Sequence, residues 1–312
     1  IHLKAVETSL IEKKDKSAYQ AMLKATSVLA SAKFFTIGTS IIRTKILAII
    51  LGPTGLGIVN VILSSLDLGR VFSTFGLDSA TARRVASAAA NNEQHEVLKV
   101  YYVAVRTALY LGVIAAVIFA CLSPVLASHL FGETGEAWWF IVAALGLIGT
   151  PLLTVELAFL QGLQQSKSLA LCQVLASVIG SIMTIVLVLL YKIDGAVIAL
   201  VSMVLSSVYV HHKFVKKHLP KNILLKKDNF FKDSSKLLRM GSAYALNGIW
   251  ITVAGYLNII FLTNYYGPSA AAHQIGLNGA AMMISSVYIN IIISAMGAEF
   301  YPRLVAVSND RK

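Results

Sequence analysis

The chain has 312 residues, of which 56% are hydrophobic and 13% are charged, and its mean hydropathy is +0.72. Soluble globular domains carry about 25% charged residues, so this composition excludes an ordinary soluble protein and predicts one that resides in a lipid bilayer. The formal net charge is +12 at pH 7. The positions of the basic residues along the chain indicate which loops face the cytoplasm.

Eight apolar segments lie between turn signals, and each is long enough for a membrane-spanning helix, which requires about 20 residues. The segments are 26–51, 56–82, 98–130, 138–163, 168–191, 195–215, 238–264 and 269–298. The third is longer than one bilayer crossing, so we expect it to extend beyond the hydrocarbon. The predicted fold class is therefore all-α, a polytopic membrane helix bundle.

The stretch LGPTGLG, residues 51–57, separates the first two segments and has the glycine spacing of a phosphate-binding loop. A Rossmann turn would need a preceding strand and an acidic residue about 20 positions later, and a Walker loop would need G-K-[ST]. The chain has neither context here. Glycine permits unusual backbone angles and proline interrupts a helix, so Gly52 and Pro53 predict a hairpin turn.

Catalytic and metal-binding motifs are not evident elsewhere in the sequence. It has no nucleophile elbow, P-loop or paired-carboxylate motif, which argues against an enzyme or an ATP-driven pump and predicts no catalytic residues and no cofactor. Cys121 and Cys172 lie alone in apolar segments, which favours isolated buried thiols over a disulfide or a metal site.

Lysine and arginine gather on alternate connections between the segments, as expected for loops on the cytoplasmic side. The residues are Lys4, Lys13, Lys14, Lys16, Lys24, Arg83, Arg84, Lys167, Lys216, Lys217, Lys221, Lys226, Lys227, Lys232 and Lys236. The N-terminus and the even-numbered connections are therefore predicted to be cytoplasmic. Topology accounts for the positive charge, so nucleic acid is not expected as a partner.

The chain divides into four predicted parts. They are a cytoplasmic N-terminal extension (1–25), a first six-helix transmembrane lobe (26–215), a basic amphipathic cytoplasmic linker (216–237) and the first two helices of a second lobe (238–312). The linker mixes lysines with large apolar residues, which suits either an interfacial helix on anionic lipid or a solvated connection.

An internal repeat supports this division. The Gly-Pro pair at 52–53 recurs at 267–268, in the hairpin between the seventh and eighth segments. The chain crosses the membrane six times between the two Gly-Pro pairs. An even number of crossings returns the chain to the same side with the same orientation, so the pattern predicts parallel repeats.

Three stretches resemble a known family: RTKILAIILGPTGLGIVN (43–60), FGLDSATARRVA (75–86) and GAEFYPRL (297–304). They are similar to the polysaccharide-export branch of the multidrug/oligosaccharidyl-lipid/polysaccharide (MOP) flippase superfamily, and most of all to Wzx-type O-antigen and common-antigen translocases. The resemblance, from about residue 24 onward, implies a flippase of undecaprenyl-pyrophosphate-linked oligosaccharide in the bacterial inner membrane, with twelve to fourteen helices in two lobes. The chain begins with Ile1 and offers eight spans, so we expect a fragment.

The resemblance also implies partners. They are the lipid-linked oligosaccharide on its undecaprenyl pyrophosphate carrier, membrane lipids, a coupling proton or sodium ion, and polysaccharide polymerase and chain-length proteins. Two alternatives stay open: a cation-coupled drug exporter of the same superfamily, and a membrane scaffold for polysaccharide assembly that transports nothing.

Charges within the spans are the candidate substrate-binding groups, because an ionisable side chain in hydrocarbon is costly and usually faces a cavity or a partner. They are Arg43, Lys45, Asp67, Arg70, Arg106 and Glu156. Arg43 and Lys45 are about 200° apart around a helix, so they cannot both face one cavity. Lys45 is nearer the outer turn and can extend to the interface. Arg43 is the leading candidate for a substrate phosphate, and the alternative is a partner with no role in transport.

The remaining four candidates form two possible pairs. Asp67 and Arg70 are three residues apart on one helical face, so they suit a structural pair or a site of ion coupling. Arg106 and Glu156 are both predicted near the inner ends of their spans, so a structural ion pair competes with a cytoplasmic gate. The histidines at 211–212 end the sixth span, where an interfacial role is expected.

Overall fold

The computed structural model describes residues 2–131, 136–219, 230–267 and 270–282, together with positions 285 and 289. Within these ranges the chain is helical and has no strand. The elements are α1 (His2–Thr74), α2 (Leu77–Ala90), α3 (Gln94–Phe131), α4 (Ala137–Ala144), α5 (Gly146–Gly162), α6 (Ser166–His218) and α7 (Phe230–Tyr266), and 270–282 form a further helical segment. Five helical segments are long and apolar enough to cross a membrane. The all-α membrane fold is confirmed.

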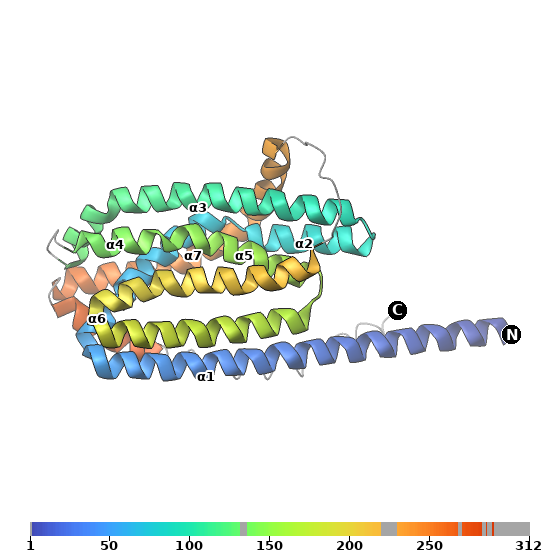
Figure 1. Ribbon diagram of the computed structural model, residues 1–312, viewed down its shortest axis with the longest axis horizontal. Helices are drawn as coiled ribbons and strands as arrows, with labels where there is room; N and C mark the ends of the chain where they lie inside the picture. Colours follow the sequence, from blue (N-terminus) through green and yellow to red (C-terminus); the bar gives the residue numbers. More distant parts are fainter. Residues whose placement is uncertain are drawn as a thin grey trace.

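Two of the long helices, α1 and α6, each cross the bundle twice, as Figure 1 shows. The chain leaves helical geometry at Gly52 in α1 (φ 66°, ψ −178°) and at Lys192 in α6 (φ 51°, ψ −122°). The hairpin predicted from Gly52 and Pro53 is therefore confirmed, and so is the turn between the fifth and sixth segments.

Two predicted spans are interrupted. The second, 56–82, breaks at Phe75 and Gly76, which both have positive φ, and α2 begins at Leu77. The break has a tertiary cause: a Cβ on Gly76 would lie 2.1 Å from the carbonyl oxygen of Gly241 in α7, so only glycine allows this backbone approach. The fourth span is divided at Leu145 into α4 and α5.

The predicted N-terminal extension and the linker are partly helical. Residues from His2 onward continue into the first span as one helix. At the two ends of the linker predicted at 216–237, α6 continues to His218 and α7 begins at Phe230. Residues 220–229, and the predicted eighth span beyond 282 apart from positions 285 and 289, lie outside the described residues.

In the middle of α3, between residues 104 and 116, the buried residues are small, while large apolar side chains point outward. Ala104, Ala108, Gly112 and Ala116 are buried at four-residue spacing, and a Cβ on Gly112 would lie 3.0 Å from the backbone of Ile148. Exposed on the other side are Leu109, Val113, Ile114, Val117 and Ile118. Close backbone packing through small residues, with large side chains toward lipid, is the arrangement of membrane helices.

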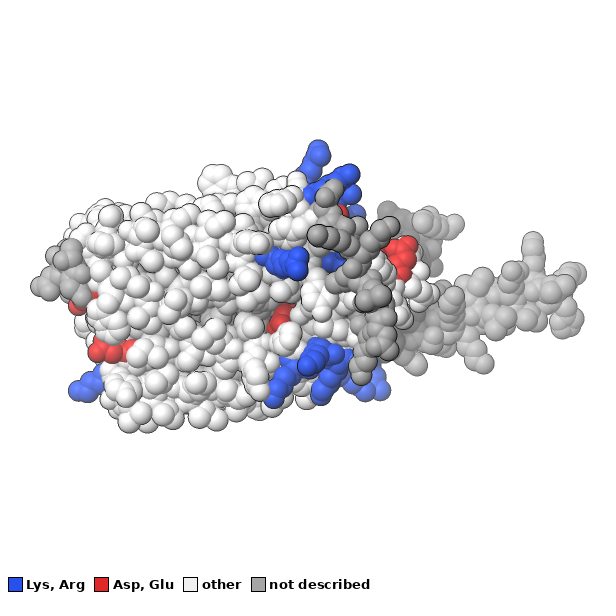
Figure 2. Space-filling model, turned by 45° about the horizontal axis from the view of Figure 1, so that its top comes forward, with Lys and Arg blue, Asp and Glu red and all other residues white. Residues whose placement is uncertain are grey.

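Charge is concentrated at one end of the bundle, which we call the basic end (Figure 2). Ion pairs tie the helices together there: Arg84 Nη2 lies 2.9 Å from Glu96 Oε1, and Lys99 Nζ lies 3.1 Å from Asp233 Oδ2. A broad uncharged surface separates this end from the opposite one in the same view, as expected of a girdle in contact with hydrocarbon.

The two predicted repeats meet in direct backbone contact. Gly267 has φ 78°, similar to the 66° of Gly52. A Cβ on Gly57 would lie 1.6 Å from the carbonyl oxygen of Ala272, and a Cβ on Gly276 would lie 2.0 Å from that of Pro53. Gly57 and Ala272 are 215 positions apart, as are the two prolines of the Gly-Pro pairs. Two residues at equivalent positions of the predicted repeats, Gly57 and Ala272, are therefore in contact.

Candidate functional site

A polar cleft of about 360 Å³ lies between the second crossing of α1, the start of α2, and α5. We call it the Arg70 cleft. Its lining residues are Arg70, Thr74, Asp78, Thr150, Leu153, Thr154, Leu157, Ala158 and Gln161. A group of polar side chains inside a bundle that is otherwise apolar is a candidate for substrate contact.

Helical spacing explains why these side chains converge. On α1, Arg70 and Thr74 are four residues apart and share one face, and on α5 the same spacing joins Thr150 to Thr154. The break after α1 then brings Asp78, in the first turn of α2, to the end of the cleft.

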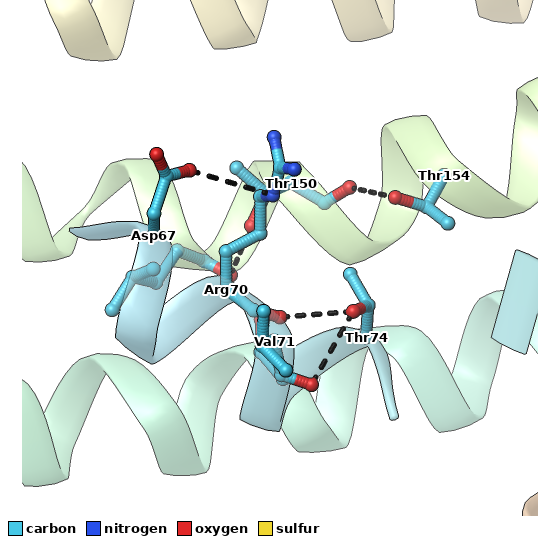
Figure 3. A network of polar contacts seen from close by, with 8 residues as sticks. Asp67, Arg70, Val71, Thr74, Thr150 and Thr154 are labelled. Atoms are coloured by element: carbon cyan, nitrogen blue, oxygen red, sulfur yellow. Dashed lines mark hydrogen bonds and ion pairs between the residues drawn. The ribbon is translucent and has the colours of Figure 1, made fainter. Parts of the chain in front are cut away.

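Polar contacts run along both the α1 side and the α5 side of the cleft (Figure 3). Arg70 Nε lies 3.7 Å from Asp67 Oδ1, and both side chains are more than half exposed. The Thr74 hydroxyl donates to the carbonyl of Arg70 at 2.9 Å, and that of Thr154 donates to the carbonyl of Thr150 at 2.9 Å. These hydroxyls give their protons to the backbone, so their oxygens remain acceptors. Among the described residues, no hydrogen bond occupies the terminal guanidinium nitrogens of Arg70.

The cleft therefore combines cationic donors with hydroxyl acceptors. A guanidinium can donate two parallel hydrogen bonds to a phosphate or carboxylate. Threonine oxygens and the amide of Gln161 can bind hydroxyl groups. This set of groups suits a ligand that is both anionic and rich in hydroxyls.

The six sequence candidates are not gathered in one place. Asp67 and Arg70 form the predicted pair beside the cleft. Arg43 lies half-buried between α1 and α6, where Nη1 donates to Met203 Sδ at 2.9 Å, while Lys45 is exposed. The prediction that Arg43 and Lys45 face different surroundings is confirmed. Arg43 as a phosphate ligand stays a prediction, and it does not line the Arg70 cleft.

The predicted pairing of Arg106 with Glu156 is wrong. Arg106 is exposed on α3, because it lies about 200° around the helix from the buried Ala104. Glu156 is 4% exposed, and its Oε1 is 2.9 Å from His212 Nδ1 on α6. His212, expected at the interface, is 54% exposed and also contacts this buried carboxylate, whereas His211, expected there too, is only 3% exposed.

Several polar residues of the cleft were not identified from the sequence. They are Thr74, Asp78, Thr150, Thr154 and Gln161. Their signal was present: threonines and a glutamine repeat along one face of an apolar helix, at positions where no packing reason requires polarity. The cysteines are both free as expected, although Cys121 is exposed and only Cys172 is buried.

An apolar groove of about 430 Å³ lies against the opposite face of the same α1 crossing. Its lining residues are Ser65, Leu68, Gly69, Phe72, Ala115, Ile118, Phe119, Leu122, Leu126 and Tyr256, from α1, α3 and α7. Leu68 lies two positions before Arg70, and Phe72 lies two positions before Thr74. Two positions correspond to about 200° around the helix. One helix thus separates a polar cleft from an apolar groove.

Comparisons with known proteins agree with this architecture. A family described as polysaccharide biosynthesis protein matches residues 22–306. Stage V sporulation protein B of Bacillus subtilis (strain 168) is 24% identical over 288 residues, which are 86% of this chain and 55% of that protein. The chain thus spans about half the length of this relative.

The fold is also similar to that of solved transporters. A eukaryotic MATE transporter, AtDTX14, superposes with a TM-score of 0.64 at 15% identity, over 84% of this chain and 61% of its own. An outward-facing multidrug resistance MATE transporter of the MOP superfamily superposes with a TM-score of 0.63 at 19% identity, over 88% of this chain and 63% of the transporter. The chain therefore has the helical fold of MATE transporters, and by the match across most of its length it belongs to the polysaccharide biosynthesis protein family.

Proposed function

We propose that the protein translocates undecaprenyl-pyrophosphate-linked oligosaccharide from the inner to the outer leaflet of the bacterial cytoplasmic membrane, by alternating access between two lobes. The observation that carries the proposal is the α1 crossing with the Arg70 cleft on one face and the apolar groove on the other. An amphiphile with an anionic, sugar-bearing head and a hydrocarbon tail requires both environments within one bilayer depth. Membership of the polysaccharide biosynthesis family supports the choice of substrate.

The cleft offers the substrate head the contacts that hydrocarbon lacks. Transfer of an unpaired hydroxyl from water into an apolar medium costs about 4–8 kcal/mol, so a bare oligosaccharide cannot cross unaided. In the cleft, Arg70 would bind the pyrophosphate while Thr150, Thr154 and Gln161 would bind sugar hydroxyls. The tail would stay in the groove lined by Leu68 and Phe72 and in the adjoining lipid.

The orientation and the partners belong to the same proposal. The basic end would face the cytoplasm with the N-terminus, in agreement with the positive-inside rule. A proton or sodium ion would supply the energy, and polymerase and chain-length proteins would receive the product. The protein would act as a transporter without enzymatic chemistry.

One observation favours the alternative of a cation-coupled drug exporter: the carboxylates of Asp67 and Asp78 lie beside Arg70. Asp67 is engaged by Arg70, and Asp78 lies in the first turn of α2, where the helix dipole compensates negative charge. The two substrate classes predict opposite effects of removing Arg70. An anionic head would lose its ligand, whereas a cationic drug would lose a repulsive charge.

The test is translocation in proteoliposomes by the full-length protein, with a labelled undecaprenyl-pyrophosphate oligosaccharide. A hydrogen bond to a charged group contributes about 1.5–3 kcal/mol, so Arg70→Ala should lower the rate about tenfold to a hundredfold at subsaturating substrate. Arg70→Lys should retain part of the translocation rate. Arg83→Ala, which removes an exposed arginine outside the cleft, is the matched control.

The outcomes separate the candidate functions. A rate for Arg70→Ala equal to that of the control would remove the cleft from the transport path. Export of a cationic dye that rises in Arg70→Ala would support the drug exporter. Wild-type protein that moves neither substrate would leave the scaffold as the better explanation.

A further inference from the structure

A buried acid and a half-exposed histidine form a pair between α5 and α6, away from the Arg70 cleft. Glu156 Oε1 lies 2.9 Å from His212 Nδ1, and the exposed fractions of the two side chains are 5% and 54%. The second carboxyl oxygen, Oε2, is buried and has no hydrogen-bond partner in the described part of the chain. Glu156 is thus closed off from solvent, whereas His212 is accessible from outside the bundle.

Burial of the Glu156 carboxyl group favours its neutral, protonated form over the charged carboxylate. A charged carboxylate with one unpaired oxygen is costly in an apolar interior, and protonation removes the cost. The described residues contain no cluster of three or more His, Cys, Asp or Glu side chains that could hold a metal ion. A bare sodium ion would need several oxygen ligands, whereas a proton needs only one carboxyl oxygen.

Besides His212, two titratable side chains on neighbouring helices interact with Glu156, and neither carries a permanent charge. Tyr101 from α3 and Cys172 from α6 lie within its electrostatic range. His211, next to its partner on α6, is 3% exposed and its Nδ1 contacts the Ser207 carbonyl at 2.7 Å. Arg70 on α1 and Asp78 on α2 line the cleft, which lies on another face of α5.

His212 gives the proton a route. It lies near the basic end, next to Lys213, which covers the Tyr209 ring at 4.5 Å. In the transfer, the ring takes a proton at Nε2 from a hydronium ion, which becomes water, while the Nδ1–H bond breaks and an O–H bond forms at Glu156 Oε1. The net change is one proton moved from water at the basic end to the buried carboxylate.

We propose that Glu156, reached through His212, is a proton-binding site that couples the pH gradient to transport. The inference rests on the proposed function for the coupling, although not for proton binding itself. Glu156 lies between Thr154 and Leu157, two residues that line the Arg70 cleft. A change of charge on one face of α5 therefore acts on the same helix that contacts the substrate.

Proton binding is tested by infrared difference spectroscopy of the full-length protein between acidic and alkaline pH. Wild-type protein should show a protonated-carboxyl band that titrates, and Glu156→Gln should lose it while keeping an acceptor for His212. Glu96→Gln, which alters an acid paired with Arg84 at the basic end, should retain the band. A band of unchanged intensity in Glu156→Gln would overturn the proton site.

Coupling is tested by translocation in proteoliposomes with and without an imposed pH gradient. The gradient should accelerate wild type and Glu96→Gln, and Glu156→Gln should lose the acceleration while still equilibrating substrate. His212→Gln should weaken the acceleration and shift the titration of the carboxyl band. Retained acceleration in Glu156→Gln would overturn the coupling. Wild-type protein that moves no substrate would overturn the proposed function and the coupling with it, while the infrared result still decides proton binding.

Discussion

Gly57→Ala tests the contact between the two repeats, because it adds one methyl group where two backbones touch. The new Cβ would lie 1.6 Å from the carbonyl oxygen of Ala272, whereas ordinary contact begins at 3.4 Å, so the helices must separate by up to the difference, 1.8 Å. Overpacking with backbone shifts costs about 1–3 kcal/mol. A carbonyl cannot rotate away, so we expect about 2–3 kcal/mol, offset by about 1 kcal/mol from the better helix propensity of alanine.

The net expectation is a loss of about 1–2 kcal/mol in the free energy of unfolding, measured as a lower midpoint of thermal unfolding in detergent. Gly38→Ala is the matched control, since it lies in the same helix and a Cβ there meets nothing within 4 Å. The control should unfold at or above the wild-type temperature. A midpoint for Gly57→Ala at or above that of Gly38→Ala would refute the backbone contact.

Two further changes probe other features of α1. Arg43→Ala should impair export of lipid-linked oligosaccharide while membrane insertion stays normal, with Lys45→Ala, the exposed neighbour, as control; export equal to wild type would remove Arg43 from the site. Gly52→Ala should destabilise by about 1–3 kcal/mol through backbone strain alone, since φ is +66° and nothing lies within 4 Å of a Cβ. Denaturant unfolding measures this loss, and equal stability would show that the turn adopts another geometry.

Features that depend on a short stretch of chain could be predicted from the sequence. A glycine before a proline sets a turn wherever it occurs between apolar segments, and Gly52 and Gly267 both adopt positive φ. The opposed directions of Arg43 and Lys45 also follow from one helix alone, because their angular separation is fixed by the number of residues between them.

Features that depend on two helices could not be predicted in this way. Hydropathy locates Arg106 and Glu156 at similar depths, but it does not give the rotation of each helix about its axis. That rotation places Arg106 outside the bundle and turns Glu156 toward His212. The break at Gly76 likewise requires the backbone of Gly241 on a distant part of the chain, and no local signal contains that information.

The lobes touch through backbone at two levels, at Gly57 with Ala272 and at Gly76 with Gly241. Nineteen residues separate the two levels along the chain, which corresponds to a lever arm of about 28 Å in helical geometry. A rotation of about 10° about the first contact would part the second by about 5 Å over that arm. Side chains also pack at the second level: Leu237 of α7 is fully buried in one cluster with Leu77 and Ala104, and Lys99 pairs with Asp233. The geometry thus supplies a pivot at one level and, toward the basic end, a packed closure that opens only if this cluster separates and the ion pair breaks.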